Sequence, residues 1–401
     1  MYNFWTLAGF EFKKLFKRKA VWLLLPLLMV FTVFSVILPS FFSSAISDSK
    51  TGQTYTLYEL QQTQRRESVS IKGRLIDDSL LEETRAAQDS DETLENGLPV
   101  SVRYDGISNF ILSSVGRLLK IEDASQFTGT ADELYSLRSE AIQESWEKDG
   151  LTKGEQQFLS EKEDSLEIPF QYGYNGGYNM IISSMITVSA MLTFLIAVCI
   201  PSMFSSEHTG KTDQLILCSR FGKAPVYLAK IFTGIIFSLG ATLLMLLSAV
   251  IPSFLLYGTE GFHVPIQILV PQASWDMTTG EAGLILIGLC LIASVLHCCA
   301  ALFFSERFKS SVPAMGILLG FLLLSGFLNI PDSYRIASQI WEFVPLNLVS
   351  AGGTIFNNRL VPFFGTYLTS WQAGPLIYLI LCLLLLTAGY QVYSRWQAGG
   401  R

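Results

Sequence analysis

Six long stretches of the chain contain no Asp, Glu, Lys or Arg, and this feature restricts the possible folds more than any other. They cover residues 20–47, 168–206, 231–259, 282–305, 310–331 and 360–394. A helix needs about 20 mostly apolar residues to cross a bilayer, and a charge at its centre costs about 2.5 kcal/mol or more. The sequence therefore predicts an α-helical membrane protein with six transmembrane helices.

We place these helices at residues 20–42, 178–204, 226–257, 282–305, 310–331 and 373–394, with loops at 258–281 and 332–372. The uncharged stretch 343–358 is short and contains Pro345, Gly352 and Gly353. Within the loop 332–372 we therefore expect re-entrant or interfacial helices. The first apolar run exceeds the 7–15 residues of a signal-peptide core, so we expect it to be retained as a span.

The polar insert at residues 43–177 holds 13 Lys/Arg and 25 Asp/Glu, which is 38 of the 62 charged residues of the chain. Capping boxes at Thr130/Glu133 and Thr152/Glu155 predict helices, and Gly150 is a natural helix end between them. Residues 100–104 alternate weakly and could form a strand. We expect a mostly helical domain with a solvated acidic surface, which could also attract cationic ligands.

The distribution of positive charge predicts the orientation of the chain. With the N-terminus inside, the inside segments, including the tail 395–401, carry 13 Lys/Arg, while the two short outside loops carry only Arg335 and Arg359. Positive charges gather on the cytoplasmic side, and long inserts cross largely regardless of charge. We therefore expect cytoplasmic termini and an extracellular insert.

Several classes of function are disfavoured by composition. The pI of about 5.3 argues against nucleic-acid binding. Three distant histidines make no metal pattern, and the insert contains no cysteine for a disulfide framework. His297, in the fourth span, is expected to pack rather than to bind a metal. The inside loops offer too few acids, bases or nucleophiles for a catalytic site, so we expect no catalytic residues and no cofactor bound by this chain.

Residues 1–19 are predicted to form an amphipathic helix at the cytoplasmic interface. Its apolar stripe holds Trp5, Ala8, Phe12, Leu15 and Phe16, and its basic residues lie mostly off that stripe. The residues that we assign to interfacial contact are Trp5, Glu11, Phe12, Lys13, Lys14, Phe16 and Lys17. A flank of positive charge for the first span is the simpler alternative.

In the fifth span, Gly316 and Gly320 form a small-xxx-small pair that could let two helices pack closely.

The loop at 205–225 is the most informative segment. Gly210, Lys211 and Thr212 imitate the end of a phosphate-binding loop, but Ser205 stands where that motif needs glycine, so we reject nucleotide binding. Instead we expect a short helix parallel to the membrane, with Glu207 near its start and Arg220 near its end, as the helix dipole favours. An exposed mixed face on such a helix would suit a protein partner.

With these segments in view, the chain resembles the permease subunits of bacterial type-2 (ABC-2) ABC transporters. The resemblance rests on the basic segment 11–19, the large insert after span one, the span count and the loop after span two. In that family the loop docks into a separate ATPase subunit. The matching residues here are Glu207, Gly210, Lys211, Thr212, Asp213, Arg220 and Lys230, while Cys218 departs from the pattern because a proline commonly lies nearby.

The resemblance implies a half-transporter in the bacterial cytoplasmic membrane. Two permease subunits, identical or related, would form the pathway in the lipid bilayer, and partner ABC ATPase subunits would bind ATP and Mg²⁺. Uncharged spans suit export of a hydrophobic or amphipathic substrate such as a peptide, drug or lipid. A sodium exporter of the same family, or a membrane sensor or scaffold that uses the insert, are the alternatives.

Overall fold

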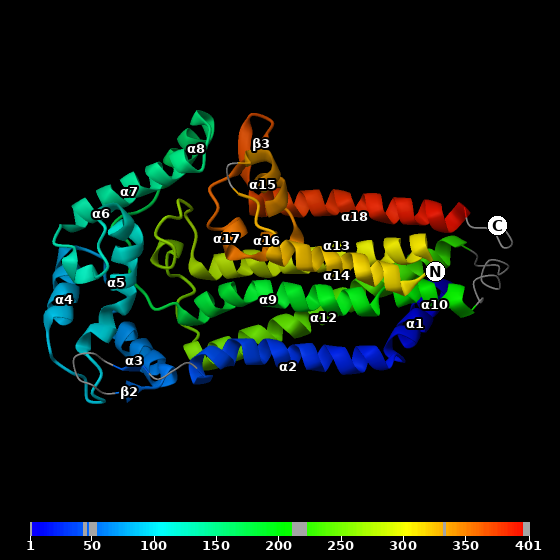
Figure 1. Ribbon diagram of the computed structural model, residues 1–401, viewed down its shortest axis with the longest axis horizontal. Coiled ribbons are helices and arrows are strands. Elements are labelled where there is room, and N and C mark those ends of the chain that lie inside the picture. Colours follow the sequence, from blue (N-terminus) through cyan, green and yellow to red (C-terminus); the bar gives the residue numbers. More distant parts are fainter. Residues whose placement is uncertain (1, 43–45, 48–53, 211–222, 332–333, 396–401) are drawn as a thin grey trace.

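The computed structural model shows a bundle of long helices that carries a polar domain at one end (Figure 1). It describes residues 2–42, 46–47, 54–210, 223–331 and 334–395. Both the first helix, α1 (Tyr2–Phe16), and the end of the last helix lie at the opposite end of the bundle from the polar domain. We call these the α1 end and the domain end.

The bundle consists of long apolar helices that run side by side (Figure 1). They are α2 (Lys19–Phe42), α9 (Gly176–Cys199), α12 (Lys223–Tyr257), α13 (Thr279–Phe308), α14 (Ser311–Phe327) and α18 (Ser370–Arg395). Helix α13 occupies the centre, where it packs against α9, α12, α14 and α18. The short α10 (Ser202–Gly210) continues from α9 at the α1 end.

Five of these helical segments within the described residues are long and apolar enough to cross a membrane: α2, α9 with α10, α12, α13 and α18. Helix α14 is apolar but has 17 residues, about 25 Å at 1.5 Å per residue, against a hydrocarbon core of about 30 Å. It stops at Phe327, before the expected residue 331, and Pro331 disfavours helical geometry at the residue that precedes it. The architecture is compatible with a multi-pass membrane protein.

The polar domain is helical and has its own core. Its main helices are α3 (Leu57–Ser70), α4 (Asp78–Asp89), α5 (Asp105–Ile111), α7 (Ala131–Lys148) and α8 (Lys153–Glu163). Shorter pieces are β1 (Ile46–Ser47), β2 (Thr54–Tyr55), η1 (Val100–Tyr104), η2 (Leu112–Gly116), α6 (Arg117–Leu119) and η3 (Ala124–Gln126). Ile76, Leu80, Ile107 and Leu134 are fully buried in this core, whereas Trp146 of α7 and Leu159 of α8 pack into the core of the bundle.

In the polar domain, two helices start at the predicted capping threonines, but the predicted strand does not form. Thr130 caps α7 by accepting a hydrogen bond from the Glu133 backbone, and Thr152 forms a complete capping box at the start of α8. Gly150 separates the two helices with a φ of +66°. The expected strand at 100–104 is wrong: the segment is the 3-10 helix η1, which leads directly into α5. The weak alternation of its residues does not produce a strand, because no described strand lies beside this segment to pair with it.

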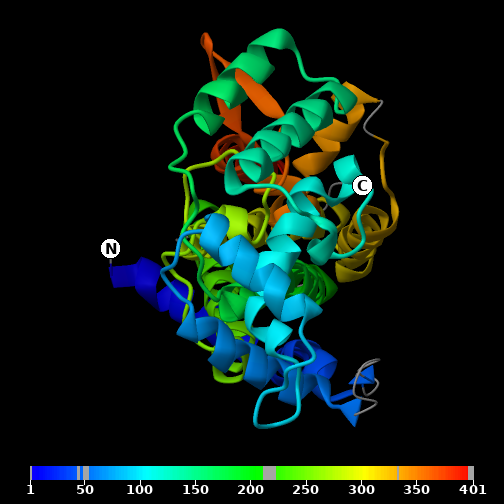
Figure 2. The same ribbon diagram turned by 90° about the vertical axis from the view of Figure 1, so that its left-hand side faces the viewer.

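The polar domain covers the domain end of the bundle and is bonded to its loops (Figure 2). Arg65 of α3 pairs with Glu260 at 2.8 Å. The buried Arg138 of α7 donates to the carbonyl oxygens of Pro271 and Ala273, which follow η4 (Ile266–Ile268). Two arginines of the domain therefore hold it to the segment between α12 and α13.

The segment between α14 and α18 contains short helices, as expected for 332–372, and one feature that was not expected. The helices are α15 (Arg335–Glu342), α16 (Pro345–Val349) and α17 (Ala351–Thr354). The unexpected feature is an antiparallel hairpin of β3 (Leu360–Phe363) and β4 (Thr366–Thr369). Helix α15 exposes apolar side chains and buries a polar one: Ile336 and Ile340 are 76% and 66% exposed, while Ser338 is buried.

Candidate functional site

Helix α10 lies where several elements converge at the α1 end of the bundle (Figure 1). It begins directly after Pro201, whose ring cannot continue the hydrogen-bond ladder of α9. It ends at Gly210, next to the expected docking loop. Helices α1, α9 and α13 all contact α10. Its position makes α10 the connection between that loop and the bundle.

Four charged side chains join α10 to α1 and α12, and we call them the charge cluster: Glu11, Lys14, Glu207 and Lys230. Lys230 Nζ donates to Glu207 Oε1 at 2.8 Å and to Glu11 Oε2 at 3.1 Å. Lys14 Nζ donates to Glu11 Oε1 at 2.7 Å and to Glu207 Oε1 at 2.8 Å. Each carboxylate therefore binds both ammonium groups, and the four side chains have no net charge.

Burial makes the charge cluster costly to break. The side chain of Lys230 is 0% exposed, and those of Glu11 and Glu207 are 7% and 8% exposed. The third donor bond of Lys230 goes to the carbonyl oxygen of Met203, at 2.8 Å, and its ammonium lies 5.2 Å from the centre of the Phe204 ring. Removing one partner from such a buried group leaves an uncompensated charge, at a typical cost of about 3–5 kcal/mol.

Lys14 is the outer member of the charge cluster, and its side chain is 49% exposed. Partial burial lowers its pKa, but the hydrogen bonds and charges of Glu11 and Glu207 more than offset this, so the pKa of Lys14 is raised. Lys14 therefore stays charged at neutral pH.

A second set of contacts fastens α10 to α13 and to the start of α2. His208 Nε2 lies 3.1 Å from Glu306 Oε2, and the Glu306 side chain is 1% exposed. Arg18 donates to the carbonyl oxygen of Ser202 at 2.7 Å. Ser305 of α13 donates to the carbonyl oxygen of Pro201. A displacement of α10 must therefore move α1, α12 and α13 or break these contacts.

Helix α1 forms where an amphipathic helix was predicted, but its buried face differs from the predicted stripe. Ala8, Glu11 and Leu15 are buried, whereas Trp5 and Phe16 are 63% and 40% exposed. The buried face packs mainly on α12, because Glu11 reaches Lys230 there and Ala8 accepts a hydrogen bond from Thr233. The exposed aromatic rings still suit a lipid interface.

The other predicted site residues fall into three groups. Lys13 and Lys17 are exposed, Phe12 is half-buried and stacks on Phe16, and Gly210 is exposed. Glu207 lies in the second half of α10, not at the start of a helix as expected, and faces inward. Lys211, Thr212, Asp213 and Arg220 lie outside the described residues.

Two predictions concern the interior and the surface of the bundle. His297 is 8% exposed, and its Nδ1 lies 2.9 Å from the carbonyl oxygen of Ala293. This fits the expected packing role. A Cβ added at Gly316 or at Gly320 would meet no described atom within 4 Å. Within the described chain, therefore, no helix uses this pair for close packing, and its face is open to another molecule.

The contacts of Glu306 and His208 were missed by sequence reasoning. Nothing in the spacing of these two residues indicates that they meet across 98 positions. A Glu at the end of an apolar span is the one signal that could have raised the question, because such a group needs a partner. Among the described residues no group of three His, Cys, Asp or Glu could hold a metal ion.

Comparison of the chain with protein-family models, with curated proteins and with solved structures gave no match.

Proposed function

We propose that the chain is the membrane-spanning permease subunit of an ATP-driven exporter of the type-2 ABC kind. The observation that carries the proposal is the charge cluster, which ties α10 to α1 and α12 through buried ion pairs. A loop that receives force from a motor protein needs a rigid connection to the transport helices. Such a connection is found at the residues that the resemblance to this family selected.

In this proposal six helices span the membrane, with α14 as the fifth, and the polar domain is extracellular. The ATPase partner binds ATP and Mg²⁺ and contacts the loop 205–225. Closure of the ATPase pair then pushes α10, and the ion pairs transmit the movement to α1 and α12. The substrate is hydrophobic or amphipathic.

A second permease subunit would complete the pathway. Helix α14 offers a surface for it, since Gly316 and Gly320 are free of close neighbours in the described chain and Phe327 is 87% exposed. Small residues let membrane helices approach closely, and that approach is a common basis of their association.

The test is co-purification of the tagged chain with proteins of its native host in mild detergent, followed by an ATPase assay. We expect an ATPase subunit to accompany the wild-type chain, and we expect Glu207→Lys to lower its recovery or its coupled activity. The substitution places a third cation beside Lys14 and Lys230, so it disrupts the connection between loop and helices.

Glu260→Lys is the matched control, because it reverses a carboxylate that pairs with an arginine at the opposite end of the bundle. Both variants must be monodisperse before they are compared. The proposal fails if no ATPase accompanies the wild-type chain. It also fails if both variants lose the ATPase equally, since the loss would then be unrelated to α10.

A further inference from the structure

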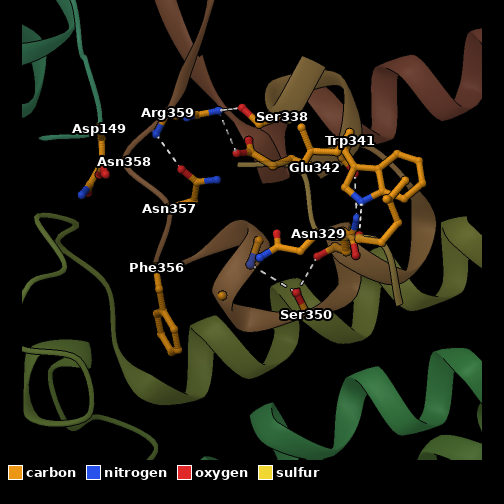
Figure 3. A pocket seen from close by; sticks show the side chains of 15 residues that line it. Asp149, Asn329, Ser338, Trp341, Glu342, Ser350, Phe356, Asn357, Asn358 and Arg359 are labelled. Atoms are coloured by element: carbon orange, nitrogen blue, oxygen red, sulfur yellow. Dashed lines mark hydrogen bonds and ion pairs between the residues drawn. The ribbon is translucent and has the colours of Figure 1, made fainter. Parts of the chain in front are cut away.

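Two cavities lie side by side: a polar pocket at the domain end, and an apolar groove that runs from the junction of α15 and α16 toward the middle of the bundle. The polar pocket has a volume of about 350 Å³ and is formed by residues 328–330 after α14, by α15 to α17 and by residues 356–359, with Asp149 at its edge (Figure 3). The apolar groove has a volume of about 460 Å³ and lies among α13, α14, α15, α16 and α18. Both volumes fall in the range of ligand pockets, roughly 300–1,000 Å³.

The same short segment lines both cavities. Trp341 and Glu342 line the polar pocket, while Ile340, Phe343 and Val344 line the apolar groove. Helix α14 and the residue after it also line the two cavities: Leu328, directly after the helix, lies beside the polar pocket, and Phe321 of α14 lies in the groove. These two residues are seven positions apart, so the polar pocket and this part of the groove are offset by about 10 Å along the axis of α14. A molecule with a polar head group and an apolar tail could occupy both cavities across this offset.

Trp341 marks the boundary between the two environments. Its indole Nε1 donates to the carbonyl oxygen of Leu328 at 3.0 Å, and its ring lies edge-on to Phe321 with centroids 6.4 Å apart. Tryptophan favours the interface between headgroups and hydrocarbon, where its ring is apolar and its N–H is satisfied. The exposed side chains of Ile336 and Phe327 flank this level and are suited to lipid.

The wall of the polar pocket indicates an uncharged, hydroxyl-rich head group. Side-chain amides of Asn329 and Asn358 line it and form no hydrogen bond with the described chain, so each offers a donor and an acceptor. The one cation in the lining is already engaged, since Arg359 lies 3.7 Å from Glu342 and donates to Ser338 (Figure 3). With Asp149 also present, the described residues of the lining offer no free positive charge for a phosphate group.

The wall of the apolar groove has no comparable polar group to offer. Its surface consists of aliphatic and aromatic side chains from several helices together with His297, whose Nδ1 lies 2.9 Å from the carbonyl oxygen of Ala293. The hydroxyl of Tyr378, which lies in its lining, already donates to the carbonyl oxygen of Phe343 at 2.8 Å. A hydrocarbon chain is the ligand that such a wall favours.

We propose that these cavities together bind a neutral glycolipid, with its sugar head group in the polar pocket and an acyl chain in the apolar groove. The inference does not depend on the exporter proposal, because it concerns lipid contact by this chain alone. Sugar hydroxyls pair with amides as donors and acceptors. The acyl chain and the wall of the apolar groove cover each other's apolar surface, which keeps that surface away from water.

The test uses the full chain in nanodiscs of phosphatidylethanolamine and phosphatidylglycerol that contain a minor fraction of diglucosyl diacylglycerol. Native mass spectrometry measures which lipids stay bound. We expect enrichment of the glycolipid over both phospholipids. Substituting Asn329→Leu and Asn358→Leu together removes about two hydrogen bonds, which predicts a loss of roughly tenfold in retention.

A second variant tests the tail. Ala300→Phe fills the groove from α13 and is expected to abolish the enrichment, whereas Leu379→Phe, at an exposed position of α18 that does not line the groove, leaves it unchanged. Equal retention of all three lipids overturns the proposal. So does enrichment of a phospholipid that the asparagine variant abolishes, since the head group would then carry phosphate. Glycolipid enrichment that survives both variants places the site elsewhere and overturns it too.

Discussion

Replacing Lys230 by methionine tests whether the charge cluster holds α1 and α10 to the bundle. Among the described residues, the substitution leaves Glu11 and Glu207 with the half-exposed Lys14 as their one ion-pair partner. Both carboxylates contact the same ammonium, so their oxygens are at most about 6 Å apart, and two such charges repel by about 3 kcal/mol at an effective dielectric constant of 20. We expect Lys230→Met to destabilise the fold by about 3–5 kcal/mol, the usual cost of breaking a buried pair.

The assay uses the cysteines of the bundle. Cys199, Cys290, Cys298, Cys299 and Cys382 are all buried, so a thiol-reactive fluorescent dye reports the opening of the bundle during thermal or denaturant unfolding. Cys218 lies outside the described residues, and the background for every variant is therefore Cys218→Ser.

Two comparisons make the prediction on Lys230 refutable. Lys148→Met breaks an exposed pair with Glu144 and should leave the stability almost unchanged, because solvent screens such a pair. The triple variant Glu11→Gln, Glu207→Gln, Lys230→Met removes the unbalanced charge and should recover most of the loss. If Lys230→Met is no more destabilising than Lys148→Met, the charge cluster does not stabilise this end of the bundle and the reasoning is wrong.

Two further predictions concern the domain end. Burial raises the pKa of Asp105 to about 7 from its ordinary 3.8, so the folded state loses stability as the pH rises between these values. The melting temperature of Asp105→Asn should therefore exceed that of wild type by a margin that grows from pH 4 to pH 7; a constant margin contradicts the assignment. In α9, a Cβ on Gly177 would collide with the backbone carbonyl of Gly258, whereas one on Gly240 of α12 would meet nothing within 4 Å. Gly177→Ala should lower the melting temperature and Gly240→Ala should raise it slightly, and similar shifts for both would refute the packing argument.

Most of the helices were predicted from two local signals, namely capping residues and long uncharged runs. The apolar runs gave the long helices to within a few residues, and Thr152 with Glu155 gave the start of α8. The β3–β4 hairpin was missed because its strands sit inside a 35-residue uncharged stretch, where apolar strands and apolar helices have the same composition. Helix α14 was predicted too long because the uncharged run continues to Pro331, whereas the helix ends at Phe327.

The partners of the charged residues could be predicted only in part. The resemblance to a transporter family selected Glu207 and Lys230, and the helical pattern selected Glu11 and Lys14, but for separate reasons. Nothing in the sequence joined these four, since hydrophobic periodicity predicts faces of helices and not which helices meet. The amphipathic pattern of α1 would place Glu11 on the polar face. In the structure Glu11 points inward, because it pairs there with the buried Lys230 of α12.

The charge cluster also has a consequence for the order in which the chain assembles. Synthesis proceeds from the N-terminus, and Glu11 precedes Lys230 by 219 residues. Glu11 and Glu207 are both made before α12 leaves the ribosome, so until then they lack their buried counter-ion. Helix α1 cannot dock in its final place before that moment. A chain that stalls before Lys230 therefore has only the half-exposed Lys14 of the charge cluster to pair with these two acids.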